Sequence, residues 1–178
     1  MKYSYITLLS DDSYIYGVML LNKSLKDVNT QYPLEVLVTS NVTKPILNIL
    51  EQLQLKYYII NPLQSDEMIK YNSKINSKFA KTWSLSLTKL EIFKMTQYDK
   101  IIYLDADIMV LKNLDHLFKY PHLTSAIDGE YFNLWPDDPH FNAGIIIIEP
   151  DKDEYDKLID FTFNNAFSNW NKHQCIAD

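Results

Sequence analysis

The stretch KIIYLDADIM, residues 100–109, places two acidic side chains directly after an apolar run. The run predicts a strand over residues 100–105 that is buried on both faces, as central strands of parallel sheets are. Its end carries Asp105 and Asp107, which are separated by Ala106. Side chains two residues apart share one face of an extended chain, so the carboxylates can converge if the extended geometry continues past the strand.

Two carboxylates in one place favour a bound cation. Like charges repel, and one carboxyl would otherwise keep its proton through a raised pKa. Mg²⁺ or Mn²⁺ removes this conflict, because each binds one or two carboxylates together with phosphate oxygens. The carboxyl ends of strands in an open α/β sheet are also where ligands bind. The acidic pair therefore indicates a metal or phosphate site.

The spacing of the pair is also compatible with chance. Asp151-Lys152-Asp153 has the same spacing at an expected helix start, where acidic side chains stabilise the helix dipole. We interpret this second pair as structural, so only the position of the first pair, after an apolar strand, favours a functional role.

Strand and helix patterns alternate along the chain. Strand-like runs cover residues 3–9, 34–39, 56–60, 100–105, 123–128 and 141–150, and helical patterns cover 13–28, 44–53, 83–97 and the segment that follows Asp151. Ser13 is the expected cap of its helix, and Asp151 with Glu154 forms a capping-box pattern. The alternation predicts one α/β domain over residues 1–178, with a mostly parallel central sheet flanked by helices. The polar stretch 61–81 predicts a long loop, either functional or merely solvated.

Composition excludes several classes of protein. The chain has 178 residues, a net charge of −6 and a single cysteine. This balance argues against a nucleic-acid surface or a polybasic membrane segment, and one cysteine excludes a disulfide scaffold within the chain. No apolar stretch is long enough to span a bilayer. We therefore expect a cytoplasmic protein with no nucleic-acid or membrane partner.

Three blocks of sequence stand in a characteristic order. They are YITLLSDDSYIYGVMLLNKSLK (5–26), LTKLEIFKMTQYDKIIYLDADIMVLKNLDHLF (87–118) and FNAGIIIIEP (141–150). Together they resemble the glycogenin-like enzymes of glycosyltransferase family 8. The resemblance implies a GT-A fold and the transfer of a hexose, usually glucose, from UDP-glucose to a carbohydrate or protein acceptor. The transfer retains configuration and uses Mn²⁺, or Mg²⁺ in its place, and a homodimer is expected.

The resemblance also implies roles for individual residues. Asp105 and Asp107 match the metal ligands, and Ala106 lies against the nucleotide sugar through its backbone. Family positions that hold uracil and ribose fall on Leu8, Ser10, Asp11 and Tyr14. For Tyr14 the alternative is an ordinary aromatic on a helix face. For the adjacent acids Asp11-Asp12 it is a pair of helix-start acids.

Further matches concern the transferred sugar. Lys89 matches a lysine that contacts the donor sugar or phosphate, with a solvated helix lysine as the alternative. Asp128 matches an acid near the sugar pocket. Asn142 matches an asparagine that hydrogen-bonds the sugar, and Gly144 allows close backbone approach, unless it serves only a strand-entry turn. Lys78 or Lys81 stands near a family arginine, and the sequence does not choose between them.

The match departs from the family at its end. The family has Asp-Gln-Gly where this chain has His173-Gln174-Cys175, so the catalytic amide is kept in Gln174 and the acid is replaced. No His-x-x-Gly-x-Lys segment, which supplies the family's third metal ligand, is present. We therefore expect the sequence to be part of a longer chain that lacks the family's C-terminal segment here.

Two alternatives to an active transferase remain open. One is a catalytically impaired domain that binds a nucleotide sugar without turnover. The other is a phosphohydrolase of the haloacid-dehalogenase type, which also ends an apolar strand with Asp-x-Asp. That class carries the motif on its first strand and follows it with Gly-Thr, whereas Ile108-Met109 follow here.

Overall fold

The computed structural model describes the core of the predicted domain. The described residues are 1–63, 85, 87–127 and 141–166. The strands are β1 Tyr3–Leu9, β2 Leu34–Thr39, β3 Lys56–Ile60, β4 Lys100–Leu104, β5 Thr124–Ile127 and β6 Phe141–Ile148. The helices are α1 Ile15–Asp27, α2 Lys44–Gln52 and α6 Lys152–Asp160, with the 3-10 helices η1 Asp12–Tyr14, η2 Leu87–Lys94 and η3 Asp115–Lys119 and the π-helical turn η4 Phe161–Ala166.

The strands of the described part form one sheet in the order β3-β2-β1-β4-β6-β5. The first four strands of this order are parallel, β6 is antiparallel to β4, and β5 is antiparallel to β6. Because β6 runs opposite to β4, its N-terminal end lies beside the C-terminal end of β4, where Leu104 pairs with Ile145. The predicted α/β fold with a mostly parallel sheet is confirmed.

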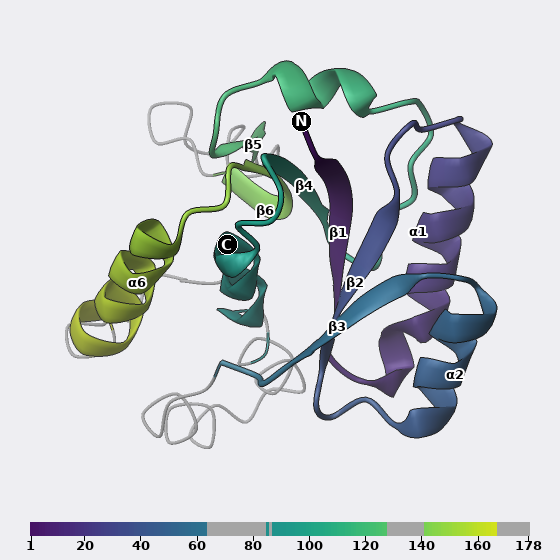
Figure 1. Ribbon diagram of the computed structural model, residues 1–178, viewed down its shortest axis with the longest axis horizontal. Helices are drawn as coiled ribbons and strands as arrows, with labels where there is room; N and C mark the ends of the chain where they lie inside the picture. The colour runs from purple at the N-terminus through teal and green to yellow at the C-terminus, as the bar shows by residue number, and fades with distance from the viewer. Residues whose placement is uncertain (64–84, 86, 128–140, 167–178) are drawn as a thin grey trace.

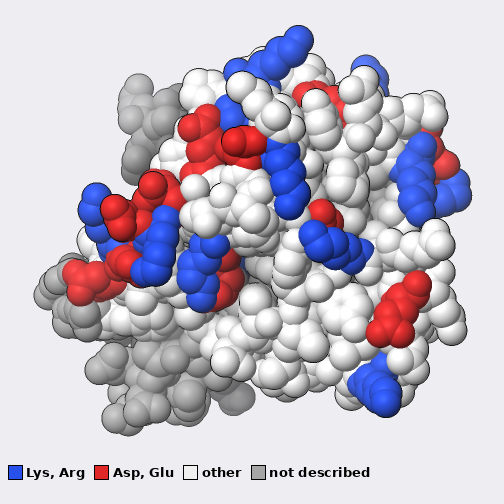
Figure 2. Space-filling view, in the orientation of Figure 1, with Lys and Arg blue, Asp and Glu red and all other residues white. Residues whose placement is uncertain are grey.

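Helices cover both faces of the sheet. Figure 1 shows α1 and α2 on one side and α6 on the other. Alternation along β1 divides the core accordingly: Tyr5 and Leu9 pack with α1 and α2, and Ile6 and Leu8 pack with η2 and α6. This is why the strand sequences are continuously apolar. On the face drawn in Figure 2, acidic and basic side chains are intermixed.

The first helix differs from the prediction at its start. Residues 12–14 form η1 before α1 begins at Ile15. Asp11 caps η1 by accepting from the Ser13 backbone N–H at 2.9 Å, so the expected cap at Ser13 is wrong. The aspartate wins because its carboxylate reaches two donors, the backbone N–H and the hydroxyl of Ser13.

The helix predicted over residues 83–97 is a 3-10 helix in the described part, η2 Leu87–Lys94. A 3-10 helix aligns residues three apart, and Glu91 forms an ion pair with Lys94 at that spacing. Glu91 also accepts a hydrogen bond of 2.6 Å from the Tyr155 hydroxyl, which ties η2 to α6.

The helix after β6 has only half of the expected capping box. Asp151 accepts from the Glu154 backbone N–H at 2.8 Å, as predicted. The Glu154 carboxylate instead binds His122 Nε2 at 2.9 Å, which links α6 to the start of β5. The loop expected over 61–81 and the helix expected after residue 171 lie almost wholly or wholly outside the described residues.

Candidate active site

The acidic pair lies in a turn at the end of an interior strand. Strand β4 ends at Leu104, one residue earlier than predicted. The Asp105 N–H donates to the Gly144 carbonyl at 2.9 Å, and the Ile108 N–H donates to the Asp105 carbonyl at 3.2 Å. Because the chain turns at Asp105, the strand pleat does not extend to Asp107. Any convergence of the two carboxylates must come from the turn, which we call the acid turn (residues 105–108).

Helix α1 holds the acid turn from one side. Ala106 is only 6% exposed, and a Cβ added at Gly17 would lie 2.4 Å from the Ala106 carbonyl oxygen. Further along the helix, the Ser24 hydroxyl accepts from the Val110 N–H at 3.1 Å. The absence of a side chain at Gly17 therefore lets the helix contact the backbone between the two aspartates directly.

Asp105 is surrounded by a cation and a phenol. Its Oδ1 lies 3.4 Å from Lys89 Nζ and accepts a hydrogen bond from the Tyr103 hydroxyl. The Lys89 side chain is only 15% exposed; its Nζ also donates to the Ala143 carbonyl at 3.3 Å and lies 5.2 Å from the centre of the Tyr103 ring. Lys89 is thus a largely buried lysine between β4 and β6, and not a solvated helix lysine.

The Tyr103 phenol experiences both acids. Burial raises its pKa well above the ordinary value, and the negative charges of Asp105 and Asp107 raise the pKa further. The phenol therefore remains a hydrogen-bond donor to Asp105 at physiological pH. Asp107 is exposed, so one carboxylate of the pair is anchored and the other faces solvent.

The start of β6 completes this corner. The Asn142 Oδ1 accepts from the Gly144 N–H at 2.8 Å, and a Cβ at Gly144 would lie 3.4 Å from Asp105 Oδ2. The β5–β6 register shifts between Ser125 and Ala126, as bulges often do near active sites. Gly144 is inside β6 rather than in an entry turn, and its missing side chain leaves space beside Asp105.

The residues expected to hold the nucleoside lie after β1. Leu8 and Ser10 are 8% and 9% exposed, and the Ser10 carbonyl accepts from the Thr39 hydroxyl at 2.6 Å. Tyr14 is partly buried against the core on the α1 side. These residues follow β1 at the same edge of the sheet as the acid turn.

The neighbouring acids have structural partners. Asp11 caps η1, and Asp12 accepts from the backbone N–H and the hydroxyl of Thr43 at 2.8 and 2.7 Å. The alternative of helix-start acids therefore describes what both side chains do in the absence of ligand, and a nucleoside contact of Asp11 stays a prediction.

Several predicted residues cannot be placed. Asp128, Gln174, His173, Lys78 and Lys81 lie outside the described residues. Conversely, the sequence reasoning missed Gly17 and Tyr103. Tyr103 was detectable, since it precedes Asp105 by two residues and so shares its strand face.

The acid turn suits a hard divalent cation. Carboxylate oxygens are the ligands that such ions prefer, Asp107 is open to solvent, and Gly144 leaves room at Asp105. Within the described residues, no group of three or more His, Cys, Asp or Glu side chains gathers around one point, so two carboxylates are the protein ligands that this part offers.

Solved structures with this architecture are GT-A glycosyltransferases. The galactosyltransferase LgtC, solved with donor and acceptor sugar analogues, has a TM-score of 0.59 at 18% identity, over 88% of this chain and 65% of that chain. GlyE of Streptococcus pneumoniae TIGR4 has a TM-score of 0.58 at 22% identity, over 96% of this chain and 41% of that chain. The fold is accordingly the GT-A fold.

Sequence comparison specifies the family. The profile of glycosyl transferase family 8 matches residues 5–174, and this chain belongs to that family. Glycogenin-1 of Caenorhabditis elegans is 30% identical over 183 residues, which is 96% of this chain and 40% of that protein. Human glycogenin-1 is 31% identical over 156 residues, 88% of this chain and 42% of that protein.

The chain spans less than half the length of these curated relatives. A further relative is inositol phosphorylceramide glucuronosyltransferase 1 of Arabidopsis thaliana, 30% identical over 149 residues, 84% of this chain and 25% of that protein. No helix in the described part of the chain combines the length and apolar character that a bilayer span requires.

Proposed function

We propose that this chain is the nucleotide-sugar-binding part of a glycosyltransferase that transfers a hexose from a UDP-sugar to a carbohydrate or protein acceptor, with retention of configuration. Glucose is the first candidate for the hexose, and Mn²⁺ or Mg²⁺ is the expected cofactor. The observation that carries the proposal is the acid turn, held against Gly17 and facing Lys89 at the end of an interior strand. Membership of family 8 supports the same reaction class.

In this proposal the acid turn binds the diphosphate end of the donor. Asp105 and Asp107 would hold the cation, which supplies positive charge for the phosphate oxygens of the leaving nucleotide. Tyr103 orients the Asp105 carboxylate through its hydrogen bond. Lys89 adds a second positive charge at this corner, in a partly buried position where charge is screened less than at the surface.

The remaining assignments follow the resemblance. Leu8, Ser10, Asp11 and Tyr14 would contact the nucleoside, and the backbone of Ala106 would lie along the donor. Asn142 and Gly144 would border the sugar, since Gly144 leaves space beside Asp105. Asp128 and Gln174, outside the described residues, are proposed at the reacting sugar.

Turnover tests the proposal. With Mn²⁺, the longest natural form of the chain should release UDP from UDP-glucose, slowly by hydrolysis even without acceptor, and Asp107→Asn should abolish the release. UDP-galactose and UDP-glucuronate belong in the same assay, because relatives are named for galactosyl and glucuronosyl transfer. If UDP appears from none of the three donors, an active transferase is ruled out.

One sequence feature favours a second candidate, a domain that binds the donor without turnover. His173 stands where the family has an acid beside the reacting sugar, and a histidine cannot supply a fixed negative charge at that point. Saturable UDP-glucose binding without UDP release would identify this case. The phosphohydrolase alternative falls with membership of family 8, and the homodimer and cytoplasmic location stay predictions.

A further inference from the structure

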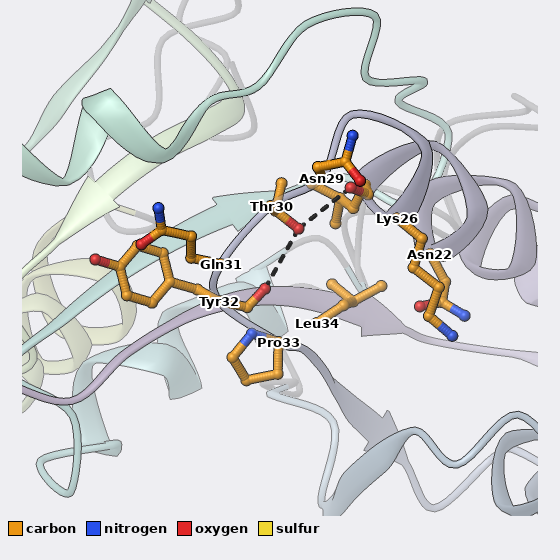
Figure 3. A pocket seen from close by; sticks show the side chains of 9 residues that line it. Asn22, Lys26, Asn29, Thr30, Gln31, Tyr32, Pro33 and Leu34 are labelled. Atoms are coloured by element: carbon orange, nitrogen blue, oxygen red, sulfur yellow. Dashed lines mark hydrogen bonds between the residues drawn. The ribbon is translucent and has the colours of Figure 1, made fainter.

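A second pocket lies at the opposite edge of the sheet from the acid turn. It has a volume of about 490 Å³ and is formed by the last turns of α1 and the turn that leads into β2. In Figure 3, Asn22 and Lys26 of α1 lie on one side and Thr30, Tyr32 and Pro33 of the turn on the other. Because α1 begins near the acid turn and ends here, the pocket is separated from the candidate active site by about 20 Å, the length of a seven-residue strand.

Asn22 is an unusual side chain at this pocket. It is only 6% exposed, and its amide has no hydrogen bond to any residue that the structure describes. The sole fully sealed side-chain polar atom without a partner in this part of the chain is Thr7 Oγ1, so the Asn22 amide keeps access to solvent. A buried amide normally has a partner, and the one open direction for Asn22 is the pocket that it lines.

The turn that forms the other wall is held by its own hydrogen bonds. The Thr30 N–H and hydroxyl donate to the Leu25 carbonyl at 3.3 and 3.2 Å. The Asn29 N–H donates to the Lys26 carbonyl at 3.1 Å, and the Asn113 amide donates to the Asn29 carbonyl at 3.0 Å. These bonds use the backbone groups and leave the pocket-lining side chains free to meet a ligand.

The free groups at the pocket are mostly neutral amides. Asn22, Asn29 and Gln31 each offer donors and an acceptor, and none of their side-chain amides is bonded within the described residues. Apolar surface is supplied beside them by Leu25, Pro33 and Leu34. Paired hydrogen-bonding groups next to an apolar surface match a sugar ring, which has hydroxyls at its edge and C–H groups on its faces.

Electrostatics argues against a charged ligand. The pocket lies at the C-terminal end of α1, where the helix dipole carries partial negative charge and disfavours anions. Lys26, the one charged residue in its lining, disfavours cations. We propose that this pocket binds a neutral saccharide. Binding itself does not depend on the transferase reaction; only a role in holding an acceptor chain away from the acid turn would rest on the proposed function.

The test is a titration with maltotetraose and with cellotetraose, followed by amide NMR shifts. The proposal expects saturable shifts in residues 22–34 with at least one of the two probes. Asn22→Leu, which keeps the volume and removes the amide, should raise the Kd about tenfold, and Gln31→Ala should raise it several-fold. Gln52→Ala, an amide deletion at the exposed end of α2, should leave the Kd unchanged.

Three results would overturn the proposal: no saturable shifts in residues 22–34 with either probe, an unchanged Kd in both pocket variants, or saturation of this pocket by inorganic phosphate but not by saccharide. Gln31→Ala keeps the test decisive if Asn22→Leu fails to fold, because Gln31 is an exposed turn residue. Mn²⁺-dependent UDP binding, measured on the same variants, should not change, which separates failure of this site from failure of the proposed function.

Discussion

At the scale of single residues, Tyr103 has the most specific role in the acid turn. Its buried hydroxyl donates to Asp105, so Tyr103→Phe should loosen the carboxylate and weaken Mn²⁺-dependent UDP binding about tenfold, or ~1.4 kcal/mol. Isothermal titration calorimetry measures this directly.

Tyr98→Phe is the matched control for this prediction. The Tyr98 hydroxyl also donates to a buried carboxylate, that of Glu35, but Glu35 lies at the start of β2, away from the acid turn. Tyr98→Phe should lower stability without changing UDP binding. Equal effects of the two variants on UDP binding would show that Tyr103 does not position Asp105.

Thr7 provides a test of stability at the same scale. Its Oγ1 is sealed in the core without a hydrogen bond, so Thr7→Val should stabilise the fold by about 1 kcal/mol, since an unpaired buried hydroxyl costs 1–3 kcal/mol. Thr39→Val removes a hydroxyl that donates to Ser10 and should destabilise by about 1 kcal/mol. Urea midpoints decide; a Thr7→Val protein less stable than Thr39→Val contradicts the account.

At the scale of elements, the contact between α1 and the acid turn decides the site's shape. Alanine normally stabilises a helix relative to glycine by about 1 kcal/mol. Gly17→Ala should do the reverse, because its Cβ would lie 2.4 Å from the Ala106 carbonyl oxygen, and the clash should destabilise by about 1–3 kcal/mol.

The same variant should weaken Mn²⁺-dependent UDP binding, because the turn between the two aspartates must move. Tyr16→Ala is the neighbouring control, since Tyr16 is 79% exposed and should change neither property by much. Thermal unfolding and calorimetry measure both, and a Gly17→Ala protein that is stabilised would refute the direct helix contact.

Elements were predictable where local patterns decide them. The strands of residues 3–9, 34–39 and 56–60 match the prediction at both ends, because apolar runs between turns specify them. Tertiary contacts decided the rest: Asp11 took the cap from Ser13 through two hydrogen bonds, and Glu154 left the capping box for His122. The site's buried Lys89 and the Gly17 contact depend on elements distant in sequence, which periodicity cannot reveal.

At the scale of the whole molecule, buried tyrosines hydrogen-bonded to acids connect separate elements. Tyr5 donates to Asp115, Tyr98 to Glu35 and Tyr155 to Glu91. Burial, together with these carboxylates, raises the pKa of each phenol. A phenol with a raised folded-state pKa contributes its full stability below the unfolded pKa of about 10 and loses it as pH rises above that value.

Stability should therefore fall progressively above about pH 10, and these phenols should ionise only as the fold is lost. Tyrosinate absorbance and circular dichroism, recorded together along an alkaline titration, test this. Exposed tyrosines such as Tyr16 should ionise first, as an internal control. Complete tyrosine ionisation with an intact circular dichroism spectrum would contradict the arrangement.

The central claim is that Asp105 and Asp107 bind a divalent cation with the donor's diphosphate. The chain supplies its own control in Asp151-Lys152-Asp153, where Asp151 caps α6 and Asp153 lies in the first turn. The most direct measurement is UDP binding with and without Mn²⁺ in Asp107→Asn and Asp153→Asn. We predict Mn²⁺-dependent binding that Asp107→Asn weakens more than tenfold, about 1.4 kcal/mol or more, and that Asp153→Asn leaves intact. UDP binding that needs no Mn²⁺, or that survives Asp107→Asn unchanged, would contradict the claim.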